Sequence, residues 1–334
     1  MNGNRVKSFI WLILVIFVFL LPVIVRQDDY ILHVGITIAF NIAMATSLWF
    51  LWSLGYVSFA HAGFMGIGAY TSALLFLRLG WSLWATMWIG AALAGIIACV
   101  VSIPLMRTKA VYFFMASWAV GEVIKMMFAL KYFRWFTGGW DGLFDILPPK
   151  LSILGLYIDF SSRVAYYYLA IMFAVAIVFI IYRLNRSRIG TILWSIHESE
   201  ALAEHAGIHL LRYKVLTFTV VCFFAGLTGA LFAHYHTFIS PRTFDIWVSE
   251  FTLVHVIVGG LATVAGPVAG ATVLTILDEL LRPLGFYRVV IFGIILILTV
   301  LFLPEGLESI PGRIRSLIRR VLKQERRFRE DATT

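Results

Sequence analysis

Residues 164–182, VAYYYLAIMFAVAIVFIIY, and residues 8–25, SFIWLILVIFVFLLPVIV, contain no charged side chain. At about 1.5 Å per residue, roughly 20 helical residues cross a hydrocarbon core of about 30 Å. Because lipid offers no hydrogen-bond partner to a backbone, such runs must be helices. These two stretches therefore predict a helical protein that spans a membrane.

The composition of the whole chain supports this class. Of the 334 residues, 61% are hydrophobic and only 13% are charged, whereas a soluble domain is nearer a quarter charged. We expect an all-α polytopic membrane protein with about ten transmembrane or re-entrant helices, some broken by Gly or Pro. The expected segments are 8–25, 30–53, 55–79, 81–103, 110–130, 163–182, 213–236, 251–263, 266–282 and 286–303.

Residues 8–25 are interpreted as a retained helix rather than a cleaved signal peptide. Its apolar stretch is too long for a signal peptide, and no small-residue cleavage site follows it. Cys99 and Cys222 both lie inside apolar runs. They are interpreted as small hydrophobic residues rather than as a disulfide or a metal site.

The orientation of the chain follows from its Lys and Arg residues, which are enriched in cytoplasmic loops. Four segments hold most of them, and all four fall on one side when the spans are counted as above. We therefore expect both termini in the cytoplasm, and the net charge of +9 reflects topology rather than nucleic-acid binding. The basic residues of these segments are Arg5, Lys7, Arg107, Lys109, Arg183, Arg186, Arg188, Arg212, Lys214, Arg313, Arg315, Arg319, Arg320, Lys323, Arg326, Arg327 and Arg329.

Two expected segments, 55–79 and 251–282, are interrupted by glycine. Broken helices are tolerated at membrane depth where they pack against protein or line a wet cavity, and paired breaks mark translocation sites in transporters. Tight helix packing is the alternative interpretation. For His61, a packed histidine and a pathway-lining histidine both stay open. The residues assigned to a translocation pathway are Ser58, His61, Gly63, Gly66, Gly259, Gly260 and Thr263.

Few charged residues lie inside the apolar runs. Glu122 and Lys125 are three residues apart on one helix face and are predicted to form an ion pair. Asp278, Glu279 and Arg282 are expected to form a solvated cluster near the end of a span. No P-loop, zinc motif or nucleophile elbow occurs in the sequence. We therefore expect no catalytic residue, no metal site and no cofactor on this chain.

Residues 187–214, SRIGTILWSIHESEALAEHAGIHLLRYK, are too polar to cross a membrane. Ser199 followed by several alanines predicts a short helix that ends at Gly207. One interpretation is a solvated connector. The other is a docking helix that presents small residues together with Glu198, Glu200 and Glu204 to a partner protein.

This loop resembles that of the inner-membrane permeases of bacterial ABC importers, in particular the branched-chain amino acid permease family. The resemblance covers nearly the whole chain. Trp49, Trp52 and Trp118 depart from the family pattern and add bulk near the expected pathway. The matching residues of the loop are Ser187, Arg188, Gly190, Ile196, Glu198, Glu200, Ala203, Glu204, Gly207 and Ile208. Those of the glycine-rich motifs are Gly55, Ser58, His61, Ala62, Phe64, Gly66, Ile67, Gly68, Ala69, Tyr70, Gly259, Gly260, Thr263, Gly266, Pro267, Gly270 and Ala271.

The resemblance implies a non-enzymatic permease subunit that imports branched-chain or other hydrophobic amino acids across the bacterial inner membrane. A permease for urea, short amides or another small solute, and an ion-coupled secondary transporter, are the alternatives. The implied partners are a homologous permease subunit, two subunits that bind ATP, and a periplasmic solute-binding protein. Coupling to the ATPase is assigned to Glu198, Glu200, Ala203, Glu204 and Gly207.

Two regions make up the expected domain organisation. Residues 1–312 form the transmembrane permease domain, with a cytoplasmic coupling loop at about 183–214. Residues 313–334 form a basic cytoplasmic tail. Because each basic residue near anionic lipid contributes about 1 kcal/mol, we expect this tail to lie on the membrane surface.

Overall fold

Six long apolar helices dominate the computed structural model, which describes residues 22, 28–153, 156–285, 287–302 and 306–309. The predicted span at 8–25, with one residue described, and the basic tail lie outside this part of the chain. Each of the six is long and apolar enough to cross a membrane. They are α2 (Asp29–Trp52), α3 (His61–Leu79), α4 (Leu83–Leu105), α5 (Ala110–Ala129), α7 (Arg163–Asn185) and α10 (Leu210–His236).

Three further apolar helices are shorter than the six. They are α11 (Ile246–Gly259), α12 (Ala265–Leu280) and α13 (Tyr287–Phe302). Helices of 14 to 16 residues extend roughly 21–24 Å, which is less than the thickness of the hydrocarbon core. The predicted helical membrane fold is thus confirmed, whereas the count of about ten membrane segments is not.

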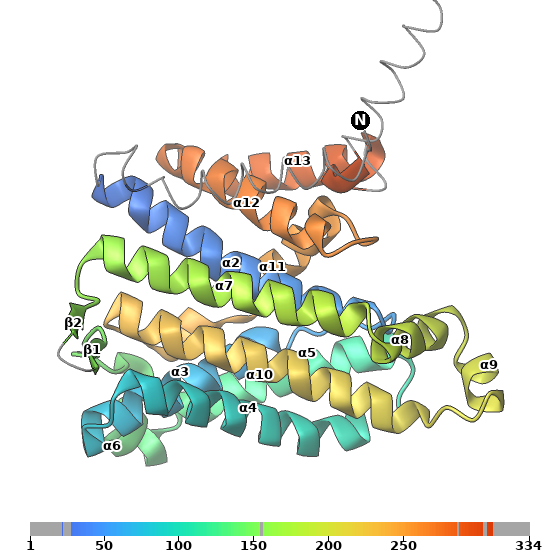
Figure 1. Ribbon diagram of the computed structural model, residues 1–334, viewed down its shortest axis with the longest axis horizontal. Coiled ribbons are helices and arrows are strands. Elements are labelled where there is room, and N and C mark those ends of the chain that lie inside the picture. The colour runs from blue at the N-terminus through green and yellow to red at the C-terminus, as the bar shows by residue number, and fades with distance from the viewer. Residues whose placement is uncertain (1–21, 23–27, 154–155, 286, 303–305, 310–334) are drawn as a thin grey trace, which may run out of the picture.

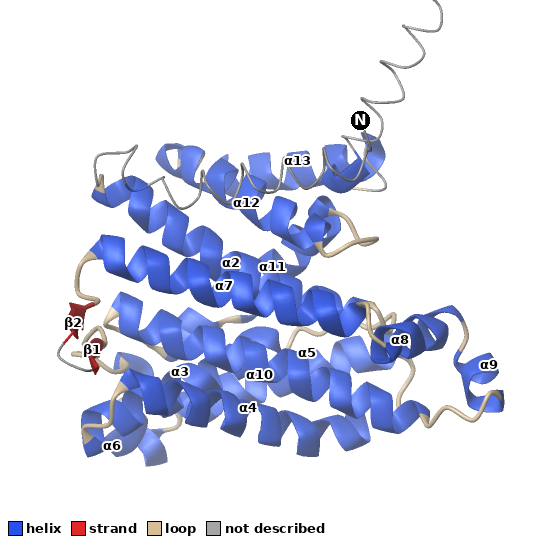
Figure 2. Cartoon of the chain, in the orientation of Figure 1, coloured by secondary structure: helices blue, strands red, loops and turns tan. Residues whose placement is uncertain are grey.

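Short elements gather at the two ends of the bundle (Figure 1, Figure 2). The α8–α9 end carries α8 (Arg188–Glu198) and α9 (Glu200–His205). The hairpin end carries α6 (Arg134–Thr137) and the antiparallel strands β1 (Lys150–Ile153) and β2 (Leu156–Asp159). The short turns are η1 (Lys131–Phe133), η2 (Gly139–Asp141), η3 (Pro241–Phe244), η4 (Arg282–Leu284) and η5 (Leu307–Ser309).

The backbones of α3, α4 and α10 are in close contact. A Cβ atom at Gly68 of α3 would overlap the carbonyl of Gly226 in α10, and one at Gly229 would overlap the carbonyl of Met65. Gly90 of α4 lies against the backbone of Gly68 in the same way. Small residues therefore let these three helices approach more closely than larger side chains would permit.

The two segments predicted to be interrupted by glycine differ in the structure. In the first, residues 53–60 are not helical, and α3 then runs without a break through Gly63 and Gly66. The interruption expected at these two glycines is wrong, because they make room for Gly121 and Phe244 instead of breaking the helix. In the second segment the break is present, since Gly260 takes a φ of 121° between α11 and α12.

We predict that Gly68→Ala lowers the free energy of unfolding by roughly 1–3 kcal/mol, because the added Cβ meets backbone rather than a movable side chain. Thermal unfolding followed by helicity measures the change. Gly293→Ala is the matched control, since nothing lies within 4 Å of a Cβ there, and it should leave stability unchanged or raise it by up to about 1 kcal/mol, because Ala favours a helix over Gly. Equal melting temperatures for the two variants would contradict the packing account.

Candidate functional site

The loop between α7 and α10 forms two helices in place of the single one expected. Ser187 caps α8 by accepting from the amide of Ile189, and Ser199 caps α9 by accepting from the amide of Leu202. Gly207 ends the second helix with a φ of 84°. The predicted start at Ser199 and end at Gly207 are therefore confirmed. The separate helix α8 was missed, although apolar residues at helical spacing, such as Leu193 and Ile196, could have indicated it.

The end of α9 is fixed by two backbone hydrogen bonds. The amide of Gly207 donates to the carbonyl of Glu204 at 2.9 Å, and that of Ile208 donates to the carbonyl of Ala203 at 3.1 Å. This pair of bonds is a Schellman motif, which requires a left-handed residue after the helix. Glycine adopts that conformation without steric cost, so the residue type at position 207 sets where α9 ends.

A polar cluster, in which Tyr56 and Lys214 are buried and Glu200 is about half exposed, ties α9 to the non-helical segment 53–60. Glu200 accepts the hydroxyl proton of Tyr56 at 2.9 Å and pairs with the ammonium of Lys214 at 2.7 Å. Lys214 is 4% exposed and also donates to the Tyr56 hydroxyl at 2.8 Å. Burial, with a further contribution from the bond to Glu200, raises the pKa of Tyr56, so its hydroxyl stays protonated.

His197 attaches helix α8 to Trp52, the residue directly before segment 53–60. Its Nδ1 lies 3.0 Å from the carbonyl oxygen of Trp52, the last residue of α2, and its ring contacts the ring of Trp52 edge-on. Tyr56 also lies 3.4 Å from the carbonyl of Thr108. Two of the loops expected on one side of the membrane, at 107–109 and 183–214, therefore do meet at the α8–α9 end.

The acidic residues assigned to coupling differ in their contacts. Glu198, Glu200 and Glu204 are all exposed, but only Glu200 is held by the cluster just described. Ala203 is buried, so the expectation that this small residue is presented to a partner is wrong. Its methyl group packs against the bundle because it lies on the inner face of α9. Sequence analysis missed Tyr56, and it used Lys214 only as a sign of topology.

The pathway residues near the start of α3 are held by hydrogen bonds. His61 is 1% exposed, and its Nε2 lies 3.0 Å from the hydroxyl of Ser47 and 3.2 Å from the carbonyl of Met44. Ser58 is equally buried and accepts from the amide of Ala60. Of the two interpretations of His61, the structure favours the packed, hydrogen-bonded histidine.

An apolar pocket of about 260 Å³ opens beside these residues, between the end of α2, segment 53–60, α5 and α11. Trp52 and Tyr56, which α8 and α9 contact, both line it. The pathway residues Ser58 and His61 do not line it, and neither do the glycines assigned with them. The lining residues are Leu48, Trp52, Tyr56, Val57, Phe114, Leu253, Val256, Ile257 and Leu261.

The turn between α11 and α12 is fastened by Glu308, which sequence analysis did not identify. The carboxylate of Glu308 accepts from the hydroxyl of Thr263 at 2.5 Å and from the amide of Ala262 at 2.8 Å. Trp49 is fully buried, and its indole donates to the carbonyl of Leu261 at 2.9 Å. Trp118, by contrast, is half exposed on α5. Trp49 thus packs inside the bundle and is hydrogen-bonded to the turn.

The predicted ion pair on α5 is confirmed, and it has a third member. The ammonium of Lys125 lies 2.7 Å from Glu122 and 3.3 Å from Asp245, which precedes α11. Lys125 is 7% exposed, whereas both carboxylates are about one-third exposed. Among the described residues, no group of three or more His, Cys, Asp and Glu side chains is placed to hold a metal ion.

Comparison with known proteins now places the chain. Residues 30–300 match the family model described as the permease component of the branched-chain amino acid transport system. The chain belongs to this permease family. The resemblance inferred from the loop and the glycine-rich motifs is therefore confirmed.

Curated relatives of this permease include two kinds of protein. It is 29% identical over 272 residues to the high-affinity branched-chain amino acid transport system permease protein LivM of Escherichia coli, and 28% identical to LivM of Salmonella typhimurium. It is 25% identical over 279 residues to LivH of Escherichia coli, of which it covers 87%. The alignments with LivM include 76% of this chain but only 64% of each relative. No solved structure matches the chain.

Lys125→Met should lower the free energy of unfolding of this permease by roughly 1–2 kcal/mol, because it leaves Glu122 and Asp245, each about one-third exposed, without the ammonium that both contact. Glu122→Gln should cost less than about 1 kcal/mol, since Asp245 still neutralises Lys125. Denaturation of the purified chain in detergent measures both. The triad would not be an energetic unit if Lys125→Met unfolded at the wild-type midpoint.

Proposed function

We propose that this chain is the transmembrane permease subunit of an ATP-driven importer that moves branched-chain or other hydrophobic amino acids into the cytoplasm. The observation that carries the proposal is the contact of α8 and α9 with the wall of the apolar pocket. Family membership and the names of the LivM and LivH relatives support the class of transport system. ATP hydrolysis is assigned to separate subunits, because the sequence has no P-loop.

Helix α9 has an outer face and an inner face with different roles. Glu204 of α9 and Glu198 at the end of α8 are exposed and can contact an ATP-binding subunit, while Glu200 at the start of α9 joins this helix to Tyr56 and Lys214. A change in the position of α9 must then alter the contacts of Tyr56. Free energy is transmitted only if α9 has two positions and the ATPase binds them with different affinity. In this docking arrangement, the exposed glutamates make the contact with the ATPase.

The apolar pocket is where such a movement would reach the solute. Its wall consists of aliphatic and aromatic side chains, and it includes the two residues, Trp52 and Tyr56, that the coupling helices hold. An apolar wall favours a hydrophobic side chain over urea or a short amide. The translocation path is assigned to the region between segment 53–60 and the Gly259–Thr263 turn. The second permease subunit completes the wall of this path.

The partners follow from the same arrangement. Similarity to both LivM and LivH supports pairing with a homologous permease subunit in a heterodimer. Two ATP-binding subunits are assigned to the α8–α9 end, and a periplasmic solute-binding protein to the hairpin end. The basic loops favour an inner-membrane orientation with both termini in the cytoplasm. Residues 1–312 are assigned to the permease domain, with about ten membrane segments, and residues 313–334 to a tail on the lipid surface.

In a reconstituted complex, Glu200→Arg should reduce transport per ATP hydrolysed by about tenfold or more, since a second cation then faces the buried Lys214. Glu204→Arg reverses the same charge on the exposed face of α9, so it should weaken binding of the ATP-binding subunits while transport per ATP stays unchanged. Solute uptake and phosphate release from the same proteoliposomes give both quantities. A Glu200→Arg complex with wild-type rates of both would refute the coupling assignment.

Gly207→Pro should uncouple transport more strongly than Gly207→Ala. Proline cannot adopt a positive φ and removes the amide that bonds to Glu204, whereas alanine keeps that amide, and no atom lies within 4 Å of its Cβ. Both variants should insert normally, as measured by protease accessibility. Uptake by the chain alone, driven by an ion gradient, would instead identify a secondary transporter.

A further inference from the structure

A second cavity, of about 310 Å³, lies at the hairpin end, where α2 and α7 begin and α10 ends. It is separate from the apolar pocket at the other end of the bundle, and its wall is of mixed polarity. The side chains that matter for its chemistry are Arg163 and Ser162 at the start of α7, His33 of α2, Tyr235 and His236 of α10, and the ring of Phe160.

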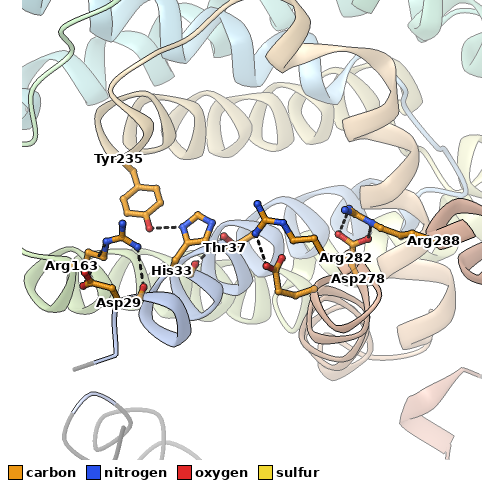
Figure 3. A network of polar contacts seen from close by, with 9 residues as sticks. Asp29, His33, Thr37, Arg163, Tyr235, Asp278, Arg282 and Arg288 are labelled. Atoms are coloured by element: carbon orange, nitrogen blue, oxygen red, sulfur yellow. Dashed lines mark hydrogen bonds and ion pairs between the residues drawn. The ribbon is translucent and has the colours of Figure 1, made fainter. Parts of the chain in front are cut away.

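The polar side chains of this cavity are fixed by contacts with one another (Figure 3). The hydroxyl of Tyr235 and Nδ1 of His33 lie 2.7 Å apart, and the two rings stack. Arg163 donates to the backbone carbonyl of Asp29 at 2.9 Å. The Asp29 carboxylate is 3.7 Å from the guanidinium and 75% exposed, so it neutralises Arg163 only weakly.

Two further arginines nearby are paired with carboxylates, and Asp159 accepts from the amide and the hydroxyl of Ser161 at the edge of the cavity. Arg282 lies 2.7 Å from Glu279, and Arg288 makes two hydrogen bonds to Asp278. Figure 3 shows these pairs on the far side of His33 from Arg163. Arg163 is therefore the cation of this network with the weakest internal partner, and it lines the cavity.

The two helix ends at the cavity carry opposite partial charges. The first residue of α7 is Arg163, so the positive end of its dipole and a guanidinium coincide. The last residues of α10, Tyr235 and His236, also line the cavity, so the negative end of its dipole lies at the same cavity. The cavity thus offers donors to an anion on one side and acceptors to a cation on the other.

We infer that this cavity binds a zwitterion, a small group with a carboxylate or phosphate next to an ammonium, with the anion at Arg163 and the ammonium near Tyr235. Two sources carry this chemistry, a free amino acid and the headgroup of an ethanolamine lipid. The aromatic ring of Phe160 gives the uncharged part of either one an apolar contact. If the ligand is an amino acid, the cavity is a site at the entry end of the translocation path, and this part of the inference rests on the proposed function. If the ligand is a lipid headgroup, the inference does not depend on the proposed function.

The test uses the full chain in phosphatidylglycerol nanodiscs, with calorimetric titration of leucine and of phosphoethanolamine. At least one of them should bind saturably, and the single-charge analogues 4-methylpentanoate and isoamylamine should bind at least about tenfold more weakly than leucine if leucine binds. Arg163→Gln should weaken binding of the zwitterion by about tenfold. Arg134→Gln, which removes another exposed arginine paired with an aspartate at the hairpin end, should leave it unchanged.

Tyr235→Phe is the second variant, since it keeps the ring and removes only the hydroxyl, and it should weaken binding about threefold or more. Binding of leucine identifies the amino acid source, and binding of phosphoethanolamine alone identifies the lipid source. The inference is overturned if neither zwitterion binds, or if neither variant weakens binding. Because the titration needs no ATP and no partner subunit, a negative result leaves the proposed coupling through Glu200 intact.

Discussion

The contact on which the rest of the structure depends is the close approach of the α3, α4 and α10 backbones at their glycines. At Gly68, Gly226 and Gly229 the helix backbones are in direct contact. The helices therefore cannot slide or tilt in a way that would place a side chain between them. In lipid, where apolar side chains gain little by association, such packing supplies much of the cohesion between helices. The three helices therefore form a rigid block to which the other elements attach.

Helix α9 and the α11–α12 turn are each held by a few polar contacts. Segment 53–60 leads directly into α3, so the backbone of Tyr56 is anchored to the rigid block, and its side chain contacts α9. The α11–α12 turn depends on Glu308 in a comparable way. Each of these hydrogen bonds contributes roughly 1–3 kcal/mol, with the higher values for bonds to a charged group, so they break more easily than the backbone block separates. The division between a rigid block and movable segments follows from this difference in chemistry.

The sequence predicted those features that depend on neighbouring residues. Apolar runs predicted the helices, and Ser199 and Gly207 predicted the ends of α9, because hydropathy and capping are local properties. The cluster of Tyr56, Glu200 and Lys214 could not be predicted, since its members lie 144 and 158 residues apart. The contact of Asp245 with Lys125 could not be predicted for the same reason, because the two residues are 120 positions apart. Glycine was ambiguous, because the same residue type opens a turn at 260 and tightens a helix crossing at 68.

The hydroxyl of Tyr56 has one proton and two acceptors within reach, the carboxylate of Glu200 at 2.9 Å and the carbonyl of Thr108 at 3.4 Å. In the coupling that we propose, an outward movement of α9 would let this proton turn to the carbonyl, so the buried donor would keep a partner. Stranding it would cost roughly 1–3 kcal/mol in each turnover. The carbonyl is the weaker acceptor, because it is neutral and lies farther away, so it lowers the cost of this movement for the tyrosine without removing it.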